Sequence, residues 1–417
     1  MIKLFILSAL ILLVFIARFL KQDIFSPAVI NIYWNAFFII GGVIFFGNGI
    51  DWGYNGILWM ILTCFSCLIG QVVGGKFQIT EISYIKEEKR NYLYVILVFI
   101  ILIGLIEPLF YVKGFGYSVL DLVDFNKLLQ LNTEIAYDRY SGHEYNAPAI
   151  SAVLSIIIYT GALVGGYAFH YMKKVGGKIL SVAVLLPIFF LAIITNAKVG
   201  VIASIFLWFI GWLLKSLQMK NLDRALTSRL LIIGVCVAIL GIAFLDLTML
   251  MRIGSIDLET QLIVNKKLQE YAFGQVNSFD YWYDSYDSTN LEMGANTYMF
   301  LTNWFGITAR KQGVYDLMPG LVSNIYTINR GIITDFGKLG GIIYWFIIGG
   351  ISGITYKRVK TGTERKIISM VILGAIYFTI LYGFIISPWI YSSYVLAFIG
   401  FGVFLVVLKY VNINFKR

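Results

Sequence analysis

The stretch Asn324-Ile-Tyr-Thr-Ile-Asn-Arg-Gly-Ile-Ile-Thr-Asp-Phe-Gly-Lys-Leu-Gly-Gly341 marks the point where a long polar region gives way to an apolar helix. It closes the segment 252–338, which is the largest polar island in a chain otherwise made of apolar runs. Chemistry that needs water, a charged ligand or a folded pocket is therefore expected to gather in this region rather than in the helices that flank it.

The composition of the chain is that of a polytopic membrane protein. Of its 417 residues, 59% are hydrophobic and 13% are charged, and the mean hydropathy is +0.79, whereas soluble domains are roughly half apolar and a quarter charged. The net charge of +10 does not indicate nucleic acid, because basic residues collect in the cytoplasmic loops of membrane proteins. The three cysteines lie in apolar runs, which supports neither a disulfide framework nor a zinc site.

Apolar runs of about 20 residues, the length that spans a hydrocarbon core of roughly 30 Å, predict about eleven membrane helices. They lie at 2–17, 28–47, 54–73, 92–112, 148–170, 179–195, 198–214, 230–251, 339–356, 367–387 and 388–408. Asn196-Ala197 forms a turn between two of them, and Ser387-Pro388 divides the last two because proline removes a backbone donor. The predicted fold is all-α, with residues 1–417 in a single integral-membrane domain.

The distribution of charge orients these helices. With the N-terminus outside and the C-terminus in the cytoplasm, the cytoplasmic loops hold most of the 33 Lys and Arg residues, and the opposite orientation inverts this bias. Two loops on the outer side, 113–147 and 252–338, are long enough to fold. Each contains an amphipathic stretch, at 118–136 and 256–272, of the kind that lies at a membrane interface.

Basic residues at the outer ends of helices are the first candidates for a functional site. Lys198 begins a helix after a tight turn, Arg252 closes a helix, and Arg330 precedes the next one. If these ends converge, they form a cationic pocket suited to a lipid-borne phosphate or pyrophosphate, which arginine binds bidentately. Alternatively, Lys198 and Arg252 extend to ordinary lipid headgroups. Arg139 and Arg310 in the two outer loops are secondary candidates for substrate binding.

Two outer residues are candidates for proton transfer. Asp335, which lies in a glycine-rich stretch, can accept a proton from a hydroxyl nucleophile or can simply be a charge at a helix N-terminus. His143 is the one histidine in the outer loops, and its ordinary pKa suits proton transfer, although a single loop histidine is more often inert. The sequence predicts no cofactor and no metal.

Short motifs give the chain a resemblance to a known family. They are Thr195-Asn-Ala-Lys-Val-Gly200 at the start of a helix, Gly294-Ala-Asn-Thr297 in the large loop, and Ile325-Tyr-Thr-Ile-Asn-Arg330 followed by Thr334-Asp-Phe-Gly337 and Leu339-Gly-Gly341. Together with the helix layout, they resemble the bacterial oligosaccharide repeat-unit polymerases, that is, O-antigen polymerases of the Wzy type. Arg330 and Gly341 also match the Arg-ten-residues-Gly motif of polymerase outer loops.

The resemblance implies a glycosyltransferase of the C type in the bacterial inner membrane, with 252–338 as a large periplasmic loop that binds substrate or acts as a lid. It implies metal-independent, inverting transfer between an undecaprenyl-pyrophosphate-linked oligosaccharide donor and acceptor, which yields O-antigen or a related surface polysaccharide. Membrane lipid, a chain-length regulator and a flippase are further implied partners. Basic residues would stabilise the departing pyrophosphate.

Two departures from the family pattern bear on the alternatives. Lys198 stands where the family usually has arginine, so the charge is kept but the bidentate fork is lost. The histidine of the related O-antigen ligases has no counterpart, because 252–338 contains no histidine; this favours a polymerase over a ligase. A lipid or polysaccharide transporter is the alternative from another class. It predicts ionisable or broken-helix sites near mid-membrane, whereas the charges here cluster at outer helix ends.

Overall fold

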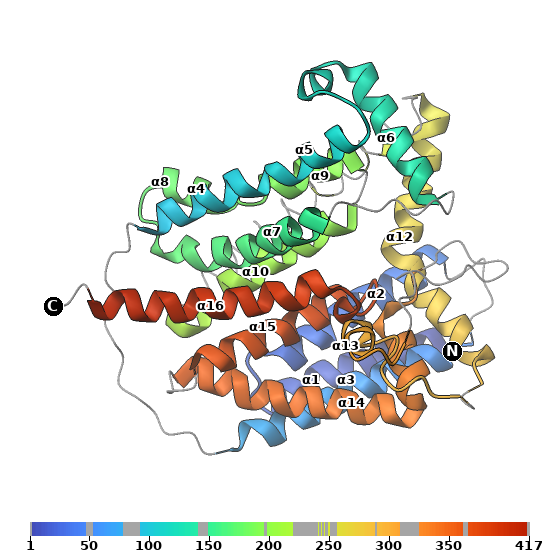
Figure 1. Ribbon diagram of the computed structural model, residues 1–417. Helices are drawn as coiled ribbons and strands as arrows, with labels where there is room; N and C mark the ends of the chain where they lie inside the picture. Colours follow the sequence, from blue (N-terminus) through green and yellow to red (C-terminus); the bar gives the residue numbers. More distant parts are fainter. Residues whose placement is uncertain are drawn as a thin grey trace. The chain divides into compact units, whose positions relative to one another are not determined.

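The structure is a computed structural model of the chain (Figure 1). It describes residues 2–46, 53–77, 92–140, 149–195, 198–219, a few positions between 241 and 250, 257–287, 290–308, 325–361 and 366–414. Within these ranges every regular element is a helix, as the sequence predicts.

Eight helices in the described ranges are long and apolar enough to cross a membrane. They are Pro27–Phe46, Asn55–Gly75, Tyr92–Gly114, Ile150–Tyr171, Val175–Thr195, Lys198–Met219, Thr327–Thr361 and Ser392–Lys409. The structure is thus consistent with a multi-pass membrane protein, whereas the count of eleven is not confirmed. α1 (Ile2–Phe19) is helical but is not among the eight, α15 (Lys366–Tyr382) is shorter, and the span expected at 230–251 lies mostly outside the described residues.

The chain divides into two compact units. Unit 1 comprises Met1–Ser83 and Lys267–Ser392, and unit 2 comprises Tyr84–Lys266 and Ser393–Arg417. Unit 1 contains α1, α2 (Pro27–Phe46), α3 (Asn55–Gly75), most of α12 (Leu258–Ser285), α13 (Met299–Trp304), α14 (Thr327–Thr361), α15 and η3 (Pro388–Ile390). Unit 2 contains α4 (Tyr92–Gly104), α5 (Ile106–Gly114), η1 (Val119–Val123), α6 (Phe125–Tyr140), α7 (Ala149–Ala168), η2 (Phe169–Tyr171), α8 (Val175–Ala183), α9 (Leu186–Thr195), α10 (Lys198–Met219) and α16 (Ser392–Asn414).

Closely packed glycines join α3 and α14 in the core of unit 1. Gly70 and Gly74 of α3 lie so near the backbone of α14 that an added Cβ would be 2.1 or 2.0 Å from a carbonyl oxygen. Gly349 and Gly353 of α14 approach the backbone of α3 in the same way, at 2.1 and 2.2 Å. Small residues four positions apart let two membrane helices pack backbone to backbone, which increases the van der Waals contact between them.

The same device joins α7 and α10 in unit 2. A Cβ added to Gly166 or Gly211 would lie 1.8 or 2.1 Å from a carbonyl oxygen of the other helix. Between these helices the buried Lys215 donates a hydrogen bond to the hydroxyl of Tyr171 at 2.8 Å. His170, which the sequence places at a helix end, lies in η2 with its Nε2 2.8 Å from Ser216 Oγ.

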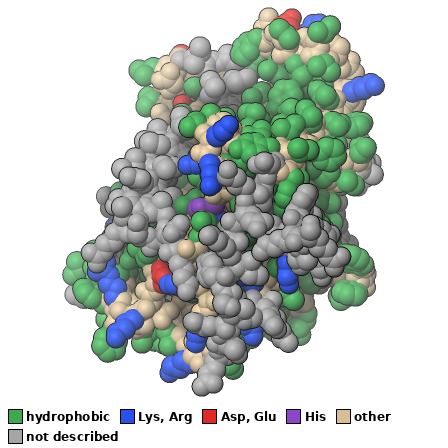
Figure 2. Space-filling model, turned by 90° about the vertical axis from the view of Figure 1, so that its left-hand side faces the viewer, with side chains coloured by type: hydrophobic (Ala, Val, Ile, Leu, Met, Phe, Trp, Pro, Cys, Tyr) green, Lys and Arg blue, Asp and Glu red, His purple; other side chains and the backbone are tan. Residues whose placement is uncertain are grey.

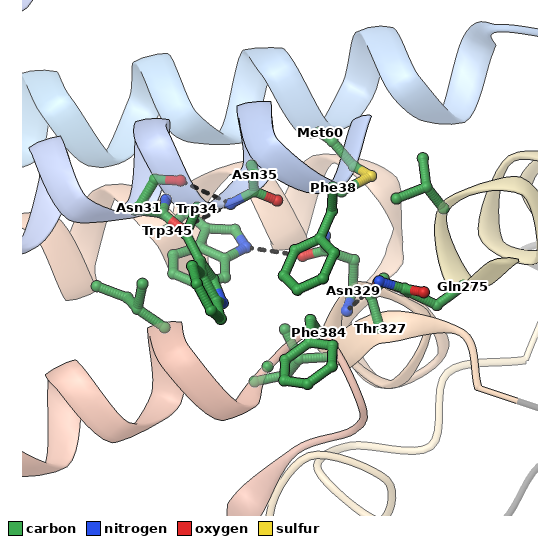
Figure 3. A pocket seen from close by; sticks show the side chains of 14 residues that line it. Asn31, Trp34, Asn35, Phe38, Met60, Gln275, Thr327, Asn329, Trp345 and Phe384 are labelled. Carbon is green, nitrogen blue, oxygen red and sulfur yellow. Dashed lines mark hydrogen bonds between the residues drawn. The ribbon is translucent and has the colours of Figure 1, made fainter. Parts of the chain in front are cut away.

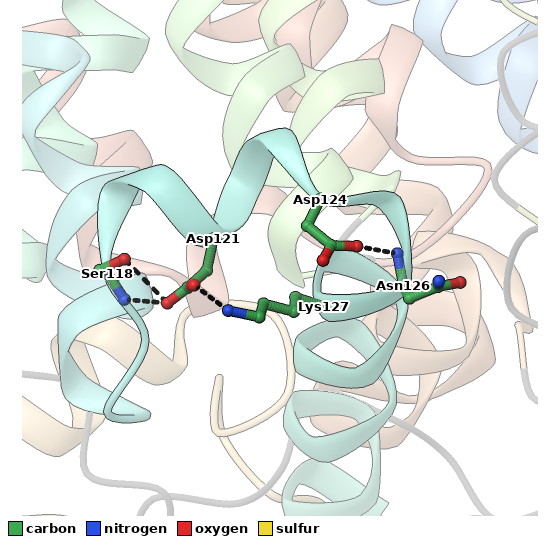
Figure 4. Close-up of polar contacts among 5 residues, drawn as sticks. All are labelled: Ser118, Asp121, Asp124, Asn126 and Lys127. Carbon is green, nitrogen blue, oxygen red and sulfur yellow. Dashed lines mark hydrogen bonds and ion pairs between the residues drawn. The ribbon is translucent and has the colours of Figure 1, made fainter.

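The amphipathic stretch predicted in the first outer loop is helical and consists of η1 and α6. Figure 4 shows how η1 begins: the Asp121 carboxylate accepts hydrogen bonds from Ser118 N at 2.7 Å and Ser118 Oγ at 2.8 Å, and it pairs with Lys127. These contacts, with that of Lys127 foremost, lower the pKa of Asp121 to about 2. The second stretch is helical as well, because α12 covers most of it; the side of the membrane on which either lies stays a prediction.

Candidate functional site

The polar stretch quoted above forms a helix that is broken and folded back on itself. α14 contains one residue with non-helical dihedral angles, Gly337, at φ 76° and ψ 169°. Trp345 Nε1 donates to Asn329 Oδ1 at 3.1 Å, although an unbroken helix would place residues 16 positions apart roughly 24 Å from each other. The short arm, residues 327–336, therefore lies back along the long arm, residues 338–361.

Both ends of the short arm have their backbone groups satisfied by other segments of unit 1. A helix end leaves N–H or C=O groups without intrahelical partners. At the start of the short arm, Ile328 N donates to Gly383 O at 2.6 Å, just after α15 ends. At its end, the carbonyl oxygens of Thr334 and Asp335 accept from the backbone of segment 290–298, at 3.1 and 3.2 Å.

Asp335 joins two of the motifs that carry the family resemblance. Its carboxylate is fully buried and accepts hydrogen bonds from Asn296 N at 3.0 Å, Asn296 Nδ2 at 2.9 Å and Thr297 N at 2.6 Å. The motif at 294–297 is thus held against the motif at 334–337, which lies 40 residues further on. These contacts are those of an anchoring carboxylate; the role of Asp335 in acceptor activation stays a prediction.

Arg330 lies on the short arm between two aromatic rings. Its guanidinium carbon is 4.2 Å from the ring centroid of Tyr326 and 5.3 Å from that of Trp282 on α12. Cation–π contacts of this kind contribute about 0.5–2 kcal/mol each. Lys338, at the start of the long arm, sits in the same manner 4.0 Å from the ring of Tyr283.

The acidic residues of α12 hold the beginning of α3. Asp280 is fully buried and accepts from Tyr54 N at 2.9 Å and Ile57 N at 3.2 Å. Burial raises the pKa of Asp280, and the backbone hydrogen bonds partly offset this increase. Asp284 accepts from Asn55 Nδ2 at 2.8 Å. α12 therefore positions α3 with two carboxylates and contacts Arg330 with the ring of Trp282.

A small polar cavity lies at the start of the short arm (Figure 3). Its volume is about 20 Å³, which accommodates about one water molecule and is far too small for a sugar or a phosphate. Four side-chain amides line it, those of Asn31, Asn35, Gln275 and Asn329. Gln275 is fully buried; its Nε2 donates to Ala272 O at 2.8 Å, and its Oε1 accepts no hydrogen bond from the residues that the structure describes. The cavity thus suits a small hydrogen-bond donor.

The predicted site residues are distributed unevenly over the structure. Arg330 and Asp335 lie on one short arm in unit 1, and Lys198 is the first residue of α10 in unit 2. The side chain of Arg139, on α6, is outside the described part of the chain, as are three whole residues, His143, Arg252 and Arg310. The convergence of Lys198 and Arg252 with Arg330 stays a prediction.

Sequence reasoning did not identify the aromatic clamp of Trp282 and Tyr326 or the reversal at Gly337. One signal was present, because Tyr326 and Arg330 are four positions apart and so share a face when the segment is helical. Nothing local indicated Trp282, which is 48 residues away and reaches Arg330 through the tertiary fold.

Comparison of the whole chain with family models, with curated proteins and with solved structures gave no match.

Proposed function

We propose that this protein polymerises undecaprenyl-pyrophosphate-linked oligosaccharide repeat units into O-antigen or a related surface polysaccharide, by inverting glycosyl transfer without a metal on the periplasmic face of the bacterial inner membrane. The proposal rests on the motifs of the short arm and on the placement of Arg330. In this reading the N-terminus is periplasmic, the C-terminus is cytoplasmic, and a flippase and a chain-length regulator work beside the enzyme.

The observation that carries the proposal is the clamped guanidinium of Arg330. The guanidinium carbon of Arg330 lies over the rings of Tyr326 and Trp282, and the N–H donors of a guanidinium group match the oxygens of a phosphate. Because the two ring contacts hold the positive charge in one place before any substrate binds, little reorganisation is needed as charge develops on a leaving group. Such preorganisation is what the departure of pyrophosphate requires.

In the proposed reaction, the bond from C1 of the donor sugar to pyrophosphate is replaced by a bond from C1 to the acceptor sugar. A hydroxyl of the non-reducing sugar on the acceptor attacks C1 of the reducing-end sugar on the donor, and the bond from C1 to the pyrophosphate oxygen breaks. The pyrophosphate leaves with the electron pair, stabilised by Arg330, and the hydroxyl proton passes to a base. Asp335 is the first candidate for this base and His143 the second; Lys198, Arg252, Arg310 and Arg139 are the further proposed contacts of the pyrophosphate.

A transporter is the second candidate, and one observation favours it. Broken helices whose half-helix ends face polar sites are characteristic of secondary transporters; α14 is broken at Gly337, and the amide-lined cavity lies at the opposite end of its short arm. The volume of that cavity, about 20 Å³, excludes a lipid or sugar in the conformation described. A transporter would form no covalent product, so the two candidates separate in one assay.

The decisive experiment is turnover by purified protein in detergent. A defined lipid-linked repeat unit is incubated with the protein, and products are resolved as a ladder by gel electrophoresis and mass spectrometry. We expect oligomers of two or more repeat units. The same protein is then reconstituted into liposomes that contain a labelled lipid. If the folded protein yields only starting material in detergent but moves the labelled lipid from one leaflet to the other, it is a transporter instead.

Arg330→Ala tests the carrying observation. We expect chain extension to fall about a hundredfold or more, the size of the loss when one preorganised charge-stabilising donor is removed. Arg330→Lys keeps the positive charge but loses the bidentate guanidinium, so its rate of chain extension is expected to lie between those of the wild type and Arg330→Ala. Arg358→Ala, near the far end of α14, is the matched control and should retain activity. Wild-type ladders from Arg330→Ala at normal protein level would remove Arg330 from the mechanism.

A deletion strain separates a polymerase from an O-antigen ligase. Loss of a polymerase leaves a single repeat unit on the lipid A core, whereas loss of a ligase leaves the core without any repeat unit. We expect the single-repeat pattern on a gel of lipopolysaccharide. Full-length ladders in that strain would contradict both activities.

A further inference from the structure

A cationic pocket lies in unit 1 where α3 and α14 end. Its volume is about 360 Å³, within the range of small-molecule sites. Three lysines line it, Lys76 at the end of α3 and Lys357 and Lys360 in the last turns of α14, and the amides of Gln22 and Gln71 complete its polar wall. Since both helices are long enough to span a membrane and both end here, the pocket lies at the level of a membrane surface.

Two of these lysines are held in place by the protein. Lys357 Nζ donates to Gly75 O at 3.1 Å and Phe77 O at 2.9 Å, beyond the end of α3. Lys360 Nζ pairs with Asp23 at 2.7 Å. Lys76 is exposed and makes no side-chain hydrogen bond or ion pair in the described part of the chain. Among the described residues, one carboxylate thus accompanies three ammonium groups, which gives this part of the pocket an excess of positive charge.

A second pocket, of about 180 Å³, adjoins the cationic one, and Gln22 lines both. It lies between α1 and α2 and is called the apolar pocket here because Val14, Ala17, Ile24, Val29 and Ile32 form most of its wall; Arg18 and Tyr33 also line it. A molecule with an anionic head and a hydrocarbon chain therefore finds a complementary surface for each part in two adjacent hollows. A soluble phosphate would occupy only the cationic pocket, and an uncharged lipid would occupy only the apolar pocket.

Figure 2 draws one face of the molecule, on which Lys and Arg side chains recur among the described residues, whereas Asp and Glu side chains are few. Basic pockets between membrane helices bind the headgroups of anionic lipids, and each lysine near the surface strengthens such binding several-fold.

We propose that the cationic pocket binds the phosphate of an anionic phospholipid, with one acyl chain lying in the apolar pocket between α1 and α2. Lys76, Lys357 and Lys360 contact the phosphate, and Val14 and Ile32 contact the chain. The site is distinct from the short arm of α14 and does not depend on the glycosyltransferase proposal. It holds a resident lipid against the helix pair that forms the core of unit 1.

Native mass spectrometry of the full-length protein, delipidated in detergent and titrated with lipid, tests this directly. We expect phosphatidylglycerol to bind at least about tenfold more tightly than phosphatidylcholine of the same chain length. The double variant Lys76→Gln, Lys360→Gln should bind phosphatidylglycerol about tenfold more weakly, because two surface lysines are lost. Equal affinities for the two lipids in the wild-type protein would overturn the proposal.

The matched control is Lys173→Gln, Lys174→Gln, which removes the same charge from two exposed lysines in unit 2. It should keep the wild-type preference for phosphatidylglycerol. An equal loss in this control would show that the overall charge, and not this pocket, governs lipid binding.

The contact between the acyl chain of the lipid and the apolar pocket is tested separately. Val14→Trp fills the apolar pocket and should weaken phosphatidylglycerol binding several-fold while the variant unfolds at the wild-type temperature. Millimolar inorganic phosphate or glycerol phosphate should not displace the lipid. Displacement by either soluble anion, or no effect of Val14→Trp in a folded protein, would mean that the pocket recognises phosphate alone and would overturn the assignment of a lipid.

Discussion

The two arms of α14 belong to one stretch of sequence but are stabilised by different forces. The long arm, 338–361, packs on α3 through Gly349 and Gly353, whose lack of side chains lets backbone meet backbone. The short arm, 327–336, is held by hydrogen bonds to three other segments: to the loop after α15, to 290–298 and to Trp345 of the long arm.

This difference explains why charge and polarity gather on one arm. A helix that packs through glycines in lipid needs no polar groups, because its backbone bonds are internal. A short helix that reverses direction leaves both ends to be satisfied, so it requires polar neighbours such as Asp335. The short arm can therefore hold Arg330 in a fixed place, which a helix facing lipid could do only at greater cost.

The largest effect is expected from breaking the anchor of the short arm. Asp335→Ala removes the acceptor of three hydrogen bonds from Asn296 and Thr297, of which that from Thr297 N is buried, whereas Asn296 Nδ2 still donates to Glu292. The loss is expected to cost about 3 kcal/mol. The loss of stability is measured by thermal unfolding in detergent and by the rate of proteolysis within 290–298. Asp335→Asn keeps one acceptor oxygen and should be intermediate. An Asp335→Ala protein as stable as the wild type would refute the anchoring role.

Asp335→Asn also separates the two roles of this residue. If Asp335 only anchors, activity should follow stability across the two variants. If Asp335 also accepts the proton, the Asn variant should be folded yet at least about a hundredfold slower.

The next effect tests the long arm with two neighbouring glycines. A Cβ at Gly349 would lie 2.1 Å from Cys67 O, whereas one at Gly350 would lie 3.8 Å from Gly70 O, an ordinary contact. Gly349→Ala should therefore lose about 2–3 kcal/mol through overpacking, and Gly350→Ala should lose almost nothing. Equal unfolding temperatures for the two variants would show that the helix pair relaxes without cost.

A smaller effect is expected at the junction of the arms. Gly337 has φ 76° and ψ 169°, a region open in practice to glycine alone, and a side chain there costs about 1–3 kcal/mol. Gly337→Ala should lower the unfolding temperature and, under the proposed function, slow chain extension by moving Arg330. Gly350→Ala is again the control, and unchanged activity with reduced stability would separate the junction from the mechanism.

The smallest effect concerns the ion pair of Lys360 and Asp23 at the end of the long arm. Burial raises the pKa of Asp23, whereas hydrogen bonds from Lys360 and Phe25 N lower it. The lowering effects together are larger, so the pKa of Asp23 is below its ordinary value. Its contribution to stability is present above about pH 4 and is lost as the pH falls through the lowered pKa. Because the pair is partly exposed, the contribution is below about 1 kcal/mol.

Asp23→Asn measures this contribution. The unfolding temperature of the variant should be slightly below that of the wild type at pH 7, and the two should converge as the pH falls below the lowered pKa of Asp23. A difference that persists or grows at low pH would exclude the ion pair as its source.

Sequence reasoning identified the helices better than the site. Apolar runs placed seven of the eight helices of spanning length to within several residues, because the length and hydropathy of a span are local properties. The break at Ser387-Pro388 is confirmed, since α15 ends at Tyr382 and α16 begins at Ser392. The segment expected to be a loop up to residue 338 is helical from Thr327, because its polar side chains are buried against other segments rather than exposed to water.

The sequence by itself determined that this chain is an all-helical membrane protein and that its polar residues gather before residue 341. The lengths of apolar runs and the positions of charged residues are local properties that can be taken directly from the sequence. The tertiary structure decided that the stretch 324–341 reverses direction at Gly337, that Asp335 anchors residues 38 and 39 positions upstream, and that Arg330 lies over the ring of Trp282. Hydrogen bonds and ring contacts between distant segments depend on how helices pack, and that information is spread over the whole chain.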